Sequence, residues 1–126
     1  ERAIIDTIHK AYPGHAILAE ETGTHGQGDY QWIVDPLDGT TNYLHGMPHW
    51  AVSIALEHKG RIVAGVIHDP VKDETFFAEK GEGAWMNERR LRVSGRTKLI
   101  ECCFATGLPF AGRRAFRPES KRGLST

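Results

Sequence analysis

Short apolar segments alternate with tight turns through the middle of the chain, and this pattern constrains the fold more than any other feature. The apolar segments are 50–56, 61–68 and 75–78, and the turns between and after them are Lys59-Gly60, 69–73 and 80–83. Turns of this length join antiparallel neighbours, whereas parallel strands need a long crossover connection. The sequence therefore predicts an antiparallel meander.

The first part of the chain adds a helix and two further strands. An apolar stripe with helical spacing ends before Pro13-Gly14 and predicts an amphipathic helix; the stripe consists of Ile4, Ile5, Ile8 and Tyr12. Segments 16–19 and 30–34 are predicted strands, separated by a polar loop at 22–29, and 99–105 is a candidate for a last strand. The expected fold class is α+β, a mostly antiparallel sheet packed with helices.

Composition and charge fit a single globular domain. The chain has 126 residues, 40% of them hydrophobic, and 16 basic side chains balance 16 acidic ones. This balance gives no reason to expect nucleic acid or an anionic membrane as the main partner. No apolar run approaches the ~20 residues that span a bilayer, and the first residues do not resemble a signal peptide. We expect a cytoplasmic protein in which Cys102 and Cys103 are reduced and half-buried.

The strongest chemical signal is the segment 32–42, WIVDPLDGTTN. An apolar strand delivers Asp35 at its carboxyl end, and Pro36 fixes the backbone that follows, so the chain is expected to leave the sheet there along a defined path. Asp38 follows three residues after Asp35. Aspartates before proline and glycine also occur in ordinary turns, where they cap backbone N–H groups, so the spacing alone leaves both interpretations open.

The residues after the second aspartate favour an anion site. Gly39 permits a sharp turn, and Thr40 or Thr41 is a suitable N-cap for a short helix through 42–44. The free N–H groups at the start of such a helix suit a phosphate. Carboxylates beside a phosphate repel it unless cations lie between them.

Hard oxygen ligands in this region favour Mg²⁺ or Mn²⁺ over zinc. Asp35 and Asp38 supply two carboxylates, and Glu20 and Glu21 follow the predicted strand 16–19. Since neighbouring strands can bring their carboxyl ends together, one of these glutamates is expected to reach the same metals. Three carboxylates of this kind fit metal-assisted phosphoryl hydrolysis.

These residues together resemble a known family. Glu20-Glu21 followed by 32–42 is similar to the first metal-binding signature of the inositol monophosphatases, within the lithium-sensitive, Mg²⁺-dependent sugar phosphatase superfamily. The resemblance extends to Asn87 and to the segments 48–54, 81–84, 91–94 and 105–110, and it covers residues 1–112.

The resemblance implies a set of metal ligands. Glu20, Asp35 and the carbonyl of Leu37 would hold one Mg²⁺, and Asp35 and Asp38 would help to hold a second. Glu21 would point elsewhere. The family's second metal also takes an aspartate from a Trp-Asp pair in a C-terminal domain, and no such pair occurs in this sequence. The site of this chain is therefore expected to hold most of the metal ligands but to be incomplete.

The same resemblance implies how substrate is handled. Gly39 and Thr40 would bind the phosphate through backbone N–H groups, with Asp38 beside the substrate. The Thr40 hydroxyl and Glu20 would orient a metal-activated water, and Asp35 would bridge the metals. The implied reaction is hydrolysis of inositol monophosphate to inositol and phosphate, with Mg²⁺ as cofactor.

The resemblance also implies the surroundings of this site. Residues 1–112 would form the N-terminal layer of an αβαβα sugar phosphatase fold, without its C-terminal domain, and 113–126 would be a disordered basic tail. The full-length protein would be a homodimer, and apolar faces meant for the missing domain would make this chain self-associate.

Two groups of alternatives remain open. A sibling enzyme would act on fructose bisphosphate or on a 3′-phosphorylated nucleotide, and its specificity would come from the missing domain. A catalytically inactive chain would instead bind a macromolecular partner, through the basic side chains of its tail: Arg113, Arg114, Arg117, Lys121 and Arg122.

Overall fold

The structure is a computed structural model, and it describes residues 1–106. Glu1–Val93 form one compact unit, and a second unit begins at Ser94. The predicted boundary at residue 112 and the basic tail at 113–126 lie outside the described residues. The candidate site lies entirely in the first unit.

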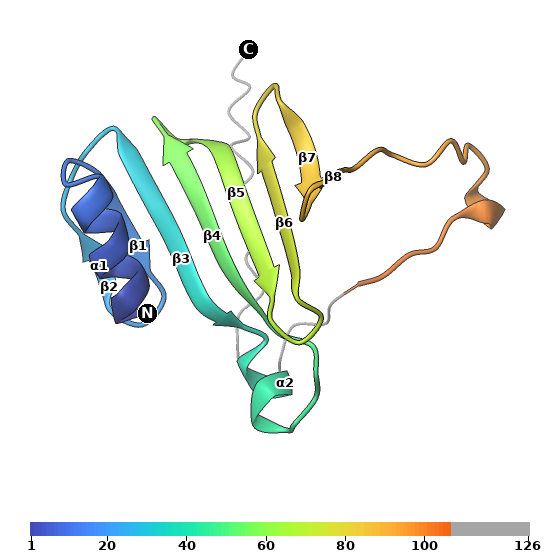
Figure 1. Cartoon of the computed structure of the whole chain (residues 1–126), viewed down its shortest axis with the longest axis horizontal. Coiled ribbons are helices and arrows are strands. Elements are labelled where there is room, and N and C mark those ends of the chain that lie inside the picture. Colours follow the sequence, from blue (N-terminus) through green and yellow to red (C-terminus); the bar gives the residue numbers. More distant parts are fainter. Residues whose placement is uncertain (107–126) are drawn as a thin grey trace, which may run out of the picture. The chain divides into compact units, whose positions relative to one another are not determined.

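The described residues of this unit form an eight-stranded sheet in the order β2-β1-β3-β4-β5-β6-β7-β8 (Figure 1). The strands are β1 Ala16–Ala19, β2 Gly23–His25, β3 Tyr30–Asp38, β4 Ala51–His58, β5 Arg61–Asp69, β6 Glu74–Glu79, β7 Gly83–Met86 and β8 Arg89–Arg90. Every neighbouring pair is antiparallel except β1 and β3, which run parallel. The predicted α+β class and the meander are confirmed.

Turn chemistry explains the meander. Lys59 and Gly60 join β4 to β5 with φ values of 50° and 78°, and two positive values in succession are typical of the hairpin turn whose twist matches the adjoining strands. The next turn contains Asp73, with a φ of 54°. Both turns were predicted from sequence.

The helix α1, Arg2–Ala11, packs across β1 and β3 (Figure 1). Ile5 and Ile8 of the helix contact a core made by Ile17, Ala19 and Val34 of the sheet. Because strand side chains alternate between faces, these sheet residues mark the face that the helix covers. Burial of this stripe holds the parallel pair β1 and β3 beneath α1.

The predicted strand 99–105 is wrong. Leu99–Glu101 form a short 3-10 helix, η1, and the residues from 102 to 106 have no strand assignment. β-branched and aromatic residues favour a strand only where a neighbouring strand completes its hydrogen bonds. The expected half-burial of the thiols is also wrong, since Cys102 and Cys103 are both exposed, although both are free as expected.

Three short strands were missed. β2 lies within the segment 22–29, which was predicted to be a loop, and β7 with β8 follows the predicted break at 80–83. β2 has only three residues and pairs with β1 alone. Strands this short carry too little alternation to be identified from sequence.

We expect Ile17→Ala to lower the free energy of unfolding by about 2–5 kcal/mol, because it opens a cavity in the α1 core. Ile17 is fully buried, with 0% of its surface exposed, whereas Ile62 on β5 is 53% exposed. Ile62→Ala is therefore the matched control and should cost much less. Urea denaturation followed by circular dichroism measures both, and equal losses would contradict the assignment of the core.

Candidate metal and phosphate site

An irregular step in β3 brings the two aspartates to one face of the sheet. Asp35 lies opposite Ser53 of β4, and Asp38 lies opposite Ala51. Three steps along β3 thus match two along β4, so β3 contains one extra residue, a bulge. In a regular strand, side chains three residues apart point to opposite faces. The bulge therefore returns Asp38 to the face that carries Asp35.

Pro36 and a local hydrogen bond account for this bulge. Pro36 has no N–H to give to the strand ladder, and proline within sheets is confined to edges, first positions and bulges. The N–H of Leu37 donates instead to Oδ1 of Asp35, at 3.0 Å. The predicted path was wrong in one respect: the chain does not leave the sheet after Val34, and β3 continues through the bulge to Asp38.

Glu20 lies beside Asp35 through the parallel pairing of β1 and β3. Ala19 pairs with Val34, and the N–H of Glu20 extends the ladder by donating to the Val34 carbonyl at 3.1 Å. Neighbouring strands lie about 4.8 Å apart, so Glu20, which directly follows β1, is adjacent to Asp35 at the bulge of β3. Ala19 and Val34 face α1, so Asp35, the next residue on β3, belongs to the opposite face.

Glu21 is engaged elsewhere through its backbone. Its N–H donates to Oε2 of Glu1 at 2.8 Å, which ties the loop after β1 to the start of α1. The side chain of Glu21 is exposed. These contacts give Glu21 a structural place outside the group formed by Glu20 and Asp35.

The donor set suits a hard divalent cation, although its side chains are not gathered into a compact cluster. Within residues 1–106, no three His, Cys, Asp or Glu side chains lie close enough together to hold a metal ion. Oδ1 of Asp35 is turned toward the N–H of Leu37. The Leu37 carbonyl accepts the Thr40 hydroxyl at 2.8 Å, and a carbonyl oxygen has a second lone pair. Carboxylates with one backbone carbonyl match the oxygen ligands of Mg²⁺; that these residues bind it stays a prediction.

The turn after the aspartates starts a short helix, α2, Thr40–Leu44. Its N-cap is Gly39, with a φ of 91°, and not Thr40 or Thr41 as predicted. Thr40 instead donates its hydroxyl to the Leu37 carbonyl.

A Cβ on Gly39 would meet the His49 carbonyl oxygen at 3.0 Å and Cα of Trp50 at 3.3 Å. Left-handed backbone and lack of space both require glycine here.

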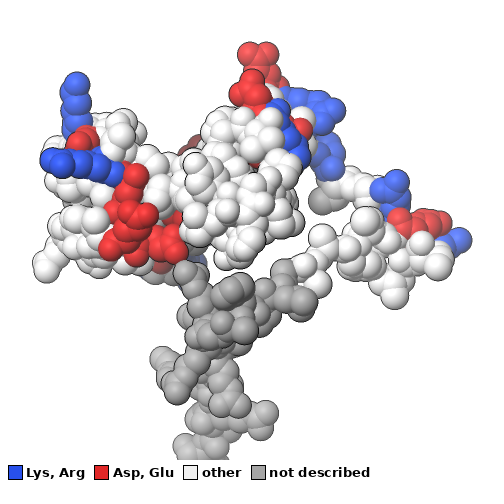
Figure 2. All heavy atoms as spheres, turned by 90° about the horizontal axis from the view of Figure 1, so that it is seen from below, with Lys and Arg blue, Asp and Glu red and all other residues white. Residues whose placement is uncertain are grey.

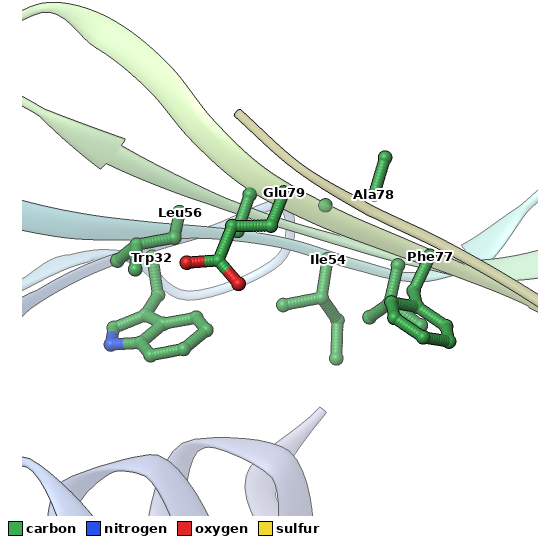
Figure 3. A pocket seen from close by; sticks show the side chains of 9 residues that line it. Trp32, Ile54, Leu56, Phe77, Ala78 and Glu79 are labelled. Atoms are coloured by element: carbon green, nitrogen blue, oxygen red, sulfur yellow. The ribbon is translucent and has the colours of Figure 1, made fainter. Parts of the chain in front are cut away.

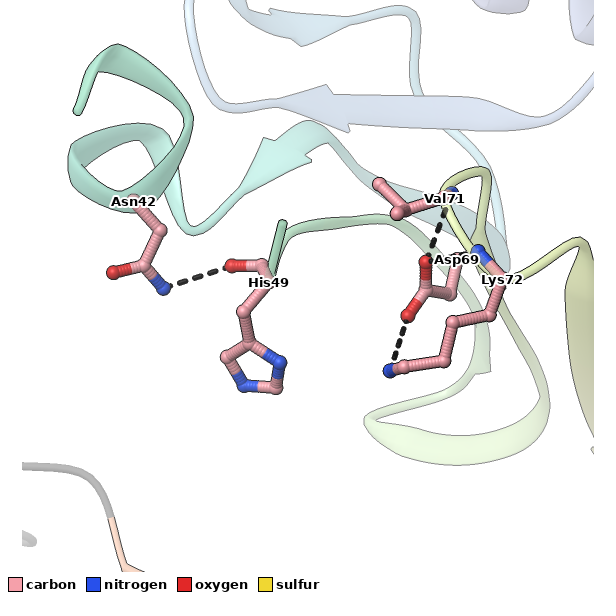
Figure 4. A network of polar contacts seen from close by, with 5 residues as sticks. All are labelled: Asn42, His49, Asp69, Val71 and Lys72. Carbon is pink, nitrogen blue, oxygen red and sulfur yellow. Dashed lines mark hydrogen bonds and ion pairs between the residues drawn. The ribbon is translucent and has the colours of Figure 1, made fainter. Parts of the chain in front are cut away.

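The sequence predicted no role for Asn42, whose side chain bonds in the structure to the segment that packs against this turn. Nδ2 of Asn42 donates to the His49 carbonyl at 2.8 Å (Figure 4). The segment that touches Gly39 is therefore also bonded to α2. The only available signal in the sequence was the position of Asn42 inside the 32–42 motif.

A second aspartate turn follows β5. The Asp69 carboxylate accepts the Val71 N–H at 3.0 Å, the Lys72 N–H at 3.1 Å and the Lys72 ammonium at 2.8 Å (Figure 4). The side-chain hydrogen bond from Lys72, with its backbone hydrogen bond, holds the pKa of Asp69 below its usual range. Asp69 in turn raises the pKa of Lys72. The aspartate closes the β5–β6 turn and is already fully engaged.

An apolar pocket of about 220 Å³ has none of the proposed metal ligands in its lining, although Glu79 lies at it. Its lining includes Trp32, Ile54, Leu56, Val66 and Phe77. In Figure 3 the side chains of Trp32, Ile54 and Phe77 extend from the face on which α1 packs. The pocket contains few groups that could bind a phosphate, and it marks a part of the apolar face that α1 leaves uncovered.

Charged side chains are unevenly distributed over the surface that Figure 2 shows. Seen from below, much of the surface carries neither sign of charge, and acidic side chains gather on the side of the sheet that carries α1 and β1 (Figure 2). An acidic group attracts cations through its field.

In the described residues, no helix is both long and apolar enough to cross a membrane.

Residues 1–124 match the sequence model of the inositol monophosphatase family, and the chain belongs to that family. The resemblance noted from the sequence motifs is therefore confirmed. The chain is 55% identical over 115 residues to an inositol-1-monophosphatase of Mesorhizobium japonicum, and this alignment covers 90% of the chain and 43% of the relative. It is 54% identical over 114 residues to a protein of Pseudomonas aeruginosa named Nus factor SuhB, with 87% and 42% covered.

A solved structure is also similar. The extragenic suppressor protein suhB of Bartonella henselae superposes with a TM-score of 0.76 at 52% identity, over 80% of this chain and 41% of that chain. The chain thus spans less than half the length of the relatives it matches. The shared fold covers 80% of this chain, and the family match covers residues 1–124.

Gly39→Ala should lower the free energy of unfolding by about 1–3 kcal/mol, because it adds backbone strain and a contact with His49. Gly46→Ala is the matched control: Gly46 has a φ of 69°, and nothing lies within 4 Å of an added Cβ. The difference between the two variants in thermal unfolding reports the contact alone. If Gly46→Ala were the more destabilising, the close packing of Gly39 would be refuted.

Asp69 should contribute stability that disappears in acid. Its folded pKa lies below the reference value of 3.8, so the unfolded chain takes up the proton first as pH falls. The contribution is complete above that value and is lost as the pH falls through it toward the folded pKa. In urea denaturation at pH 7 and pH 3, Asp69→Asn should be less stable than the parent at pH 7, with a smaller difference at pH 3. A difference that grows in acid would contradict this sign.

Proposed function

We propose that this chain carries the metal and phosphate site of a Mg²⁺-dependent phosphatase that hydrolyses inositol monophosphate to inositol and phosphate. One observation carries the proposal: the bulge in β3 places Asp35 and Asp38 on one face, next to Glu20 and directly before Gly39. Membership of the inositol monophosphatase family supports it. The coarser activity is phosphomonoester hydrolysis, and inositol monophosphate is its proposed substrate.

Each residue of the site has a proposed part. Glu20, Asp35, Asp38 and the Leu37 carbonyl would hold the cation, which when bound supplies neutralising charge for the phosphate oxygens and an activated water. The N–H groups at the start of a helix have no partner within it, which leaves them available to phosphate. Backbone N–H groups of Gly39 and Thr40 would bind the phosphate in this way.

Thr40 and Glu20 would handle the nucleophile. The Thr40 hydroxyl is fixed by its hydrogen bond to the Leu37 carbonyl, and this holds its oxygen in a defined orientation at the edge of the turn. An oxygen held in this way can accept a hydrogen bond from a water molecule. Glu20, adjacent to Asp35 through the β1–β3 ladder, would take up the proton that the attacking water releases.

Two enzymatic siblings share this chemistry. The same carboxylates and turn could serve hydrolysis of fructose bisphosphate or of a 3′-phosphorylated nucleotide, since all three substrates present a phosphate ester. Relative values of kcat/KM for the three substrates would distinguish them. We favour inositol monophosphate because a relative at 55% identity is named inositol-1-monophosphatase.

A second candidate function is a partner-binding role without catalysis. The observation that favours it is the name Nus factor SuhB, which the Pseudomonas aeruginosa relative carries at 54% identity. On this alternative the chain would bind metal without turnover and contact a macromolecule.

We further propose that the longer protein is cytoplasmic and homodimeric and that this chain alone self-associates. Light scattering that gives a monodisperse monomer would contradict the self-association.

The test is phosphate release from inositol 1-phosphate by the purified chain, with and without Mg²⁺. Asp38→Asn removes one carboxylate charge from the proposed metal set and should lower the rate at least about 100-fold. The matched control is Asp29→Asn: Asp29 lies at the far end of β3, in an exposed ion pair with Lys59 at 3.4 Å, and its loss should leave the rate unchanged.

The outcomes test the proposed site. Mg²⁺-dependent release that Asp38→Asn abolishes supports the phosphatase. Mg²⁺ binding without release, measured by calorimetry and weakened in Asp38→Asn, supports the metal site and is expected both of a phosphatase site that lacks its C-terminal domain and of an inactive partner-binding chain. A chain that neither binds Mg²⁺ nor releases phosphate, or an Asp38→Asn variant as active as the parent, would refute the proposed site.

A further inference from the structure

The turn that carries Asp38 and Gly39 rests on the residues that lead into β4. Asp38 lies opposite Ala51 in the sheet. Gly39 faces the His49 carbonyl and Trp50 so closely that a Cβ would reach the carbonyl oxygen at 3.0 Å. A shift of His49 or Trp50 would therefore move the turn as well.

Strand pairing does not itself hold His49 and Trp50 in place, because β4 begins at Ala51. Their position depends on contacts with α2. The Asn42 amide donates to the His49 carbonyl at 2.8 Å, and the Tyr43 ring meets the Trp50 ring edge-on at a centroid distance of 5.2 Å. The polar contact is directional and fixes the carbonyl that Gly39 touches.

Asn42 also closes the loop from its other side. Its backbone carbonyl accepts the N–H of Met47 at 2.8 Å and that of His45 at 3.2 Å. Asn42 therefore makes two bonds to the loop between α2 and β4. Its backbone carbonyl holds the middle of the loop at Met47, and its side chain holds the end of the loop at His49. Figure 4 shows the amide of Asn42 pointing at the His49 carbonyl.

We propose that Asn42 is a positioning residue for the candidate site. Its side chain holds the His49 carbonyl against Gly39 and so fixes the direction of the Asp38 carboxylate and of the N–H groups that follow it. Asn42 does not touch substrate or metal in this role. The inference rests on the proposed function, because it assigns a support to that same metal and phosphate site.

The amide group suits this role. An aspartate at position 42 would present a carboxylate oxygen to the oxygen of the His49 carbonyl, and two acceptors repel one another. An alanine would remove the donor and leave His49 and Trp50 to be held by ring packing alone. Both changes should loosen the turn while leaving the sheet and the α1 core intact.

The experiment compares Asn42→Ala with Asn87→Ala in the whole chain. Asn87 is a matched control because its amide also closes a turn: Oδ1 accepts the Thr75 N–H at 2.8 Å, and Nδ2 donates to the Asp73 carbonyl at 3.3 Å. Asn87 contacts no residue of the 38–40 turn through these bonds. Two quantities are measured: the Mg²⁺-dependent affinity for inorganic phosphate, by calorimetry, and the amide exchange rate of peptides that cover residues 36–50, by mass spectrometry.

We expect Asn42→Ala to weaken phosphate binding by up to about tenfold and to speed exchange in 36–50, because one directional hydrogen bond is lost. Asn87→Ala should change neither. If exchange in 36–50 is faster in Asn42→Ala but the parent binds no phosphate, Asn42 does hold the turn and the proposed function is refuted. Unchanged exchange in Asn42→Ala, or an equal loss of phosphate binding in Asn87→Ala, would overturn the inference.

Discussion

One extra residue in β3 is the constraint on which the candidate site depends. Without it, Asp38 would point to the face that α1 covers, away from Asp35, because strand side chains alternate. Pro36 favours the bulge by removing a ladder donor, and the Asp35 carboxylate takes the N–H of Leu37 in its place. A residue that cannot pair in a sheet thus becomes the means of placing two carboxylates together.

Packing of the core and placement of the site are linked through the only parallel pair among the described strands. Burial of Ile17 and Val34 beneath α1 fixes the register of β1 on β3. That register continues by one hydrogen bond to Glu20, so an apolar contact on one face sets the place of a carboxylate at the edge. The site is therefore rigid on the β1 side for a reason unrelated to its own chemistry.

The remainder of the sheet is less well covered than this corner. Phe77 is 43% exposed on the face that α1 shares, and Ile67 is 49% exposed on the opposite face. Hydrogen bonding between strands and the two well-formed hairpin turns hold this region together. The buried apolar core of the described unit thus lies beneath α1, and β4 contributes Ala51 as the partner of Asp38.

The sequence by itself determined the helix and the meander and indicated the residues of the candidate site, because apolar periodicity, turn residues such as Lys59-Gly60 and the 32–42 motif are local signals. It did not reveal that β3 continues through Pro36, that Gly39 caps α2, or that Asn42 supports the turn. These features depend on which residues face one another across strands, and the exposure of Cys102 likewise depends on which neighbours surround it. Register and burial are properties of pairs of segments distant in sequence, so only the tertiary structure decided them.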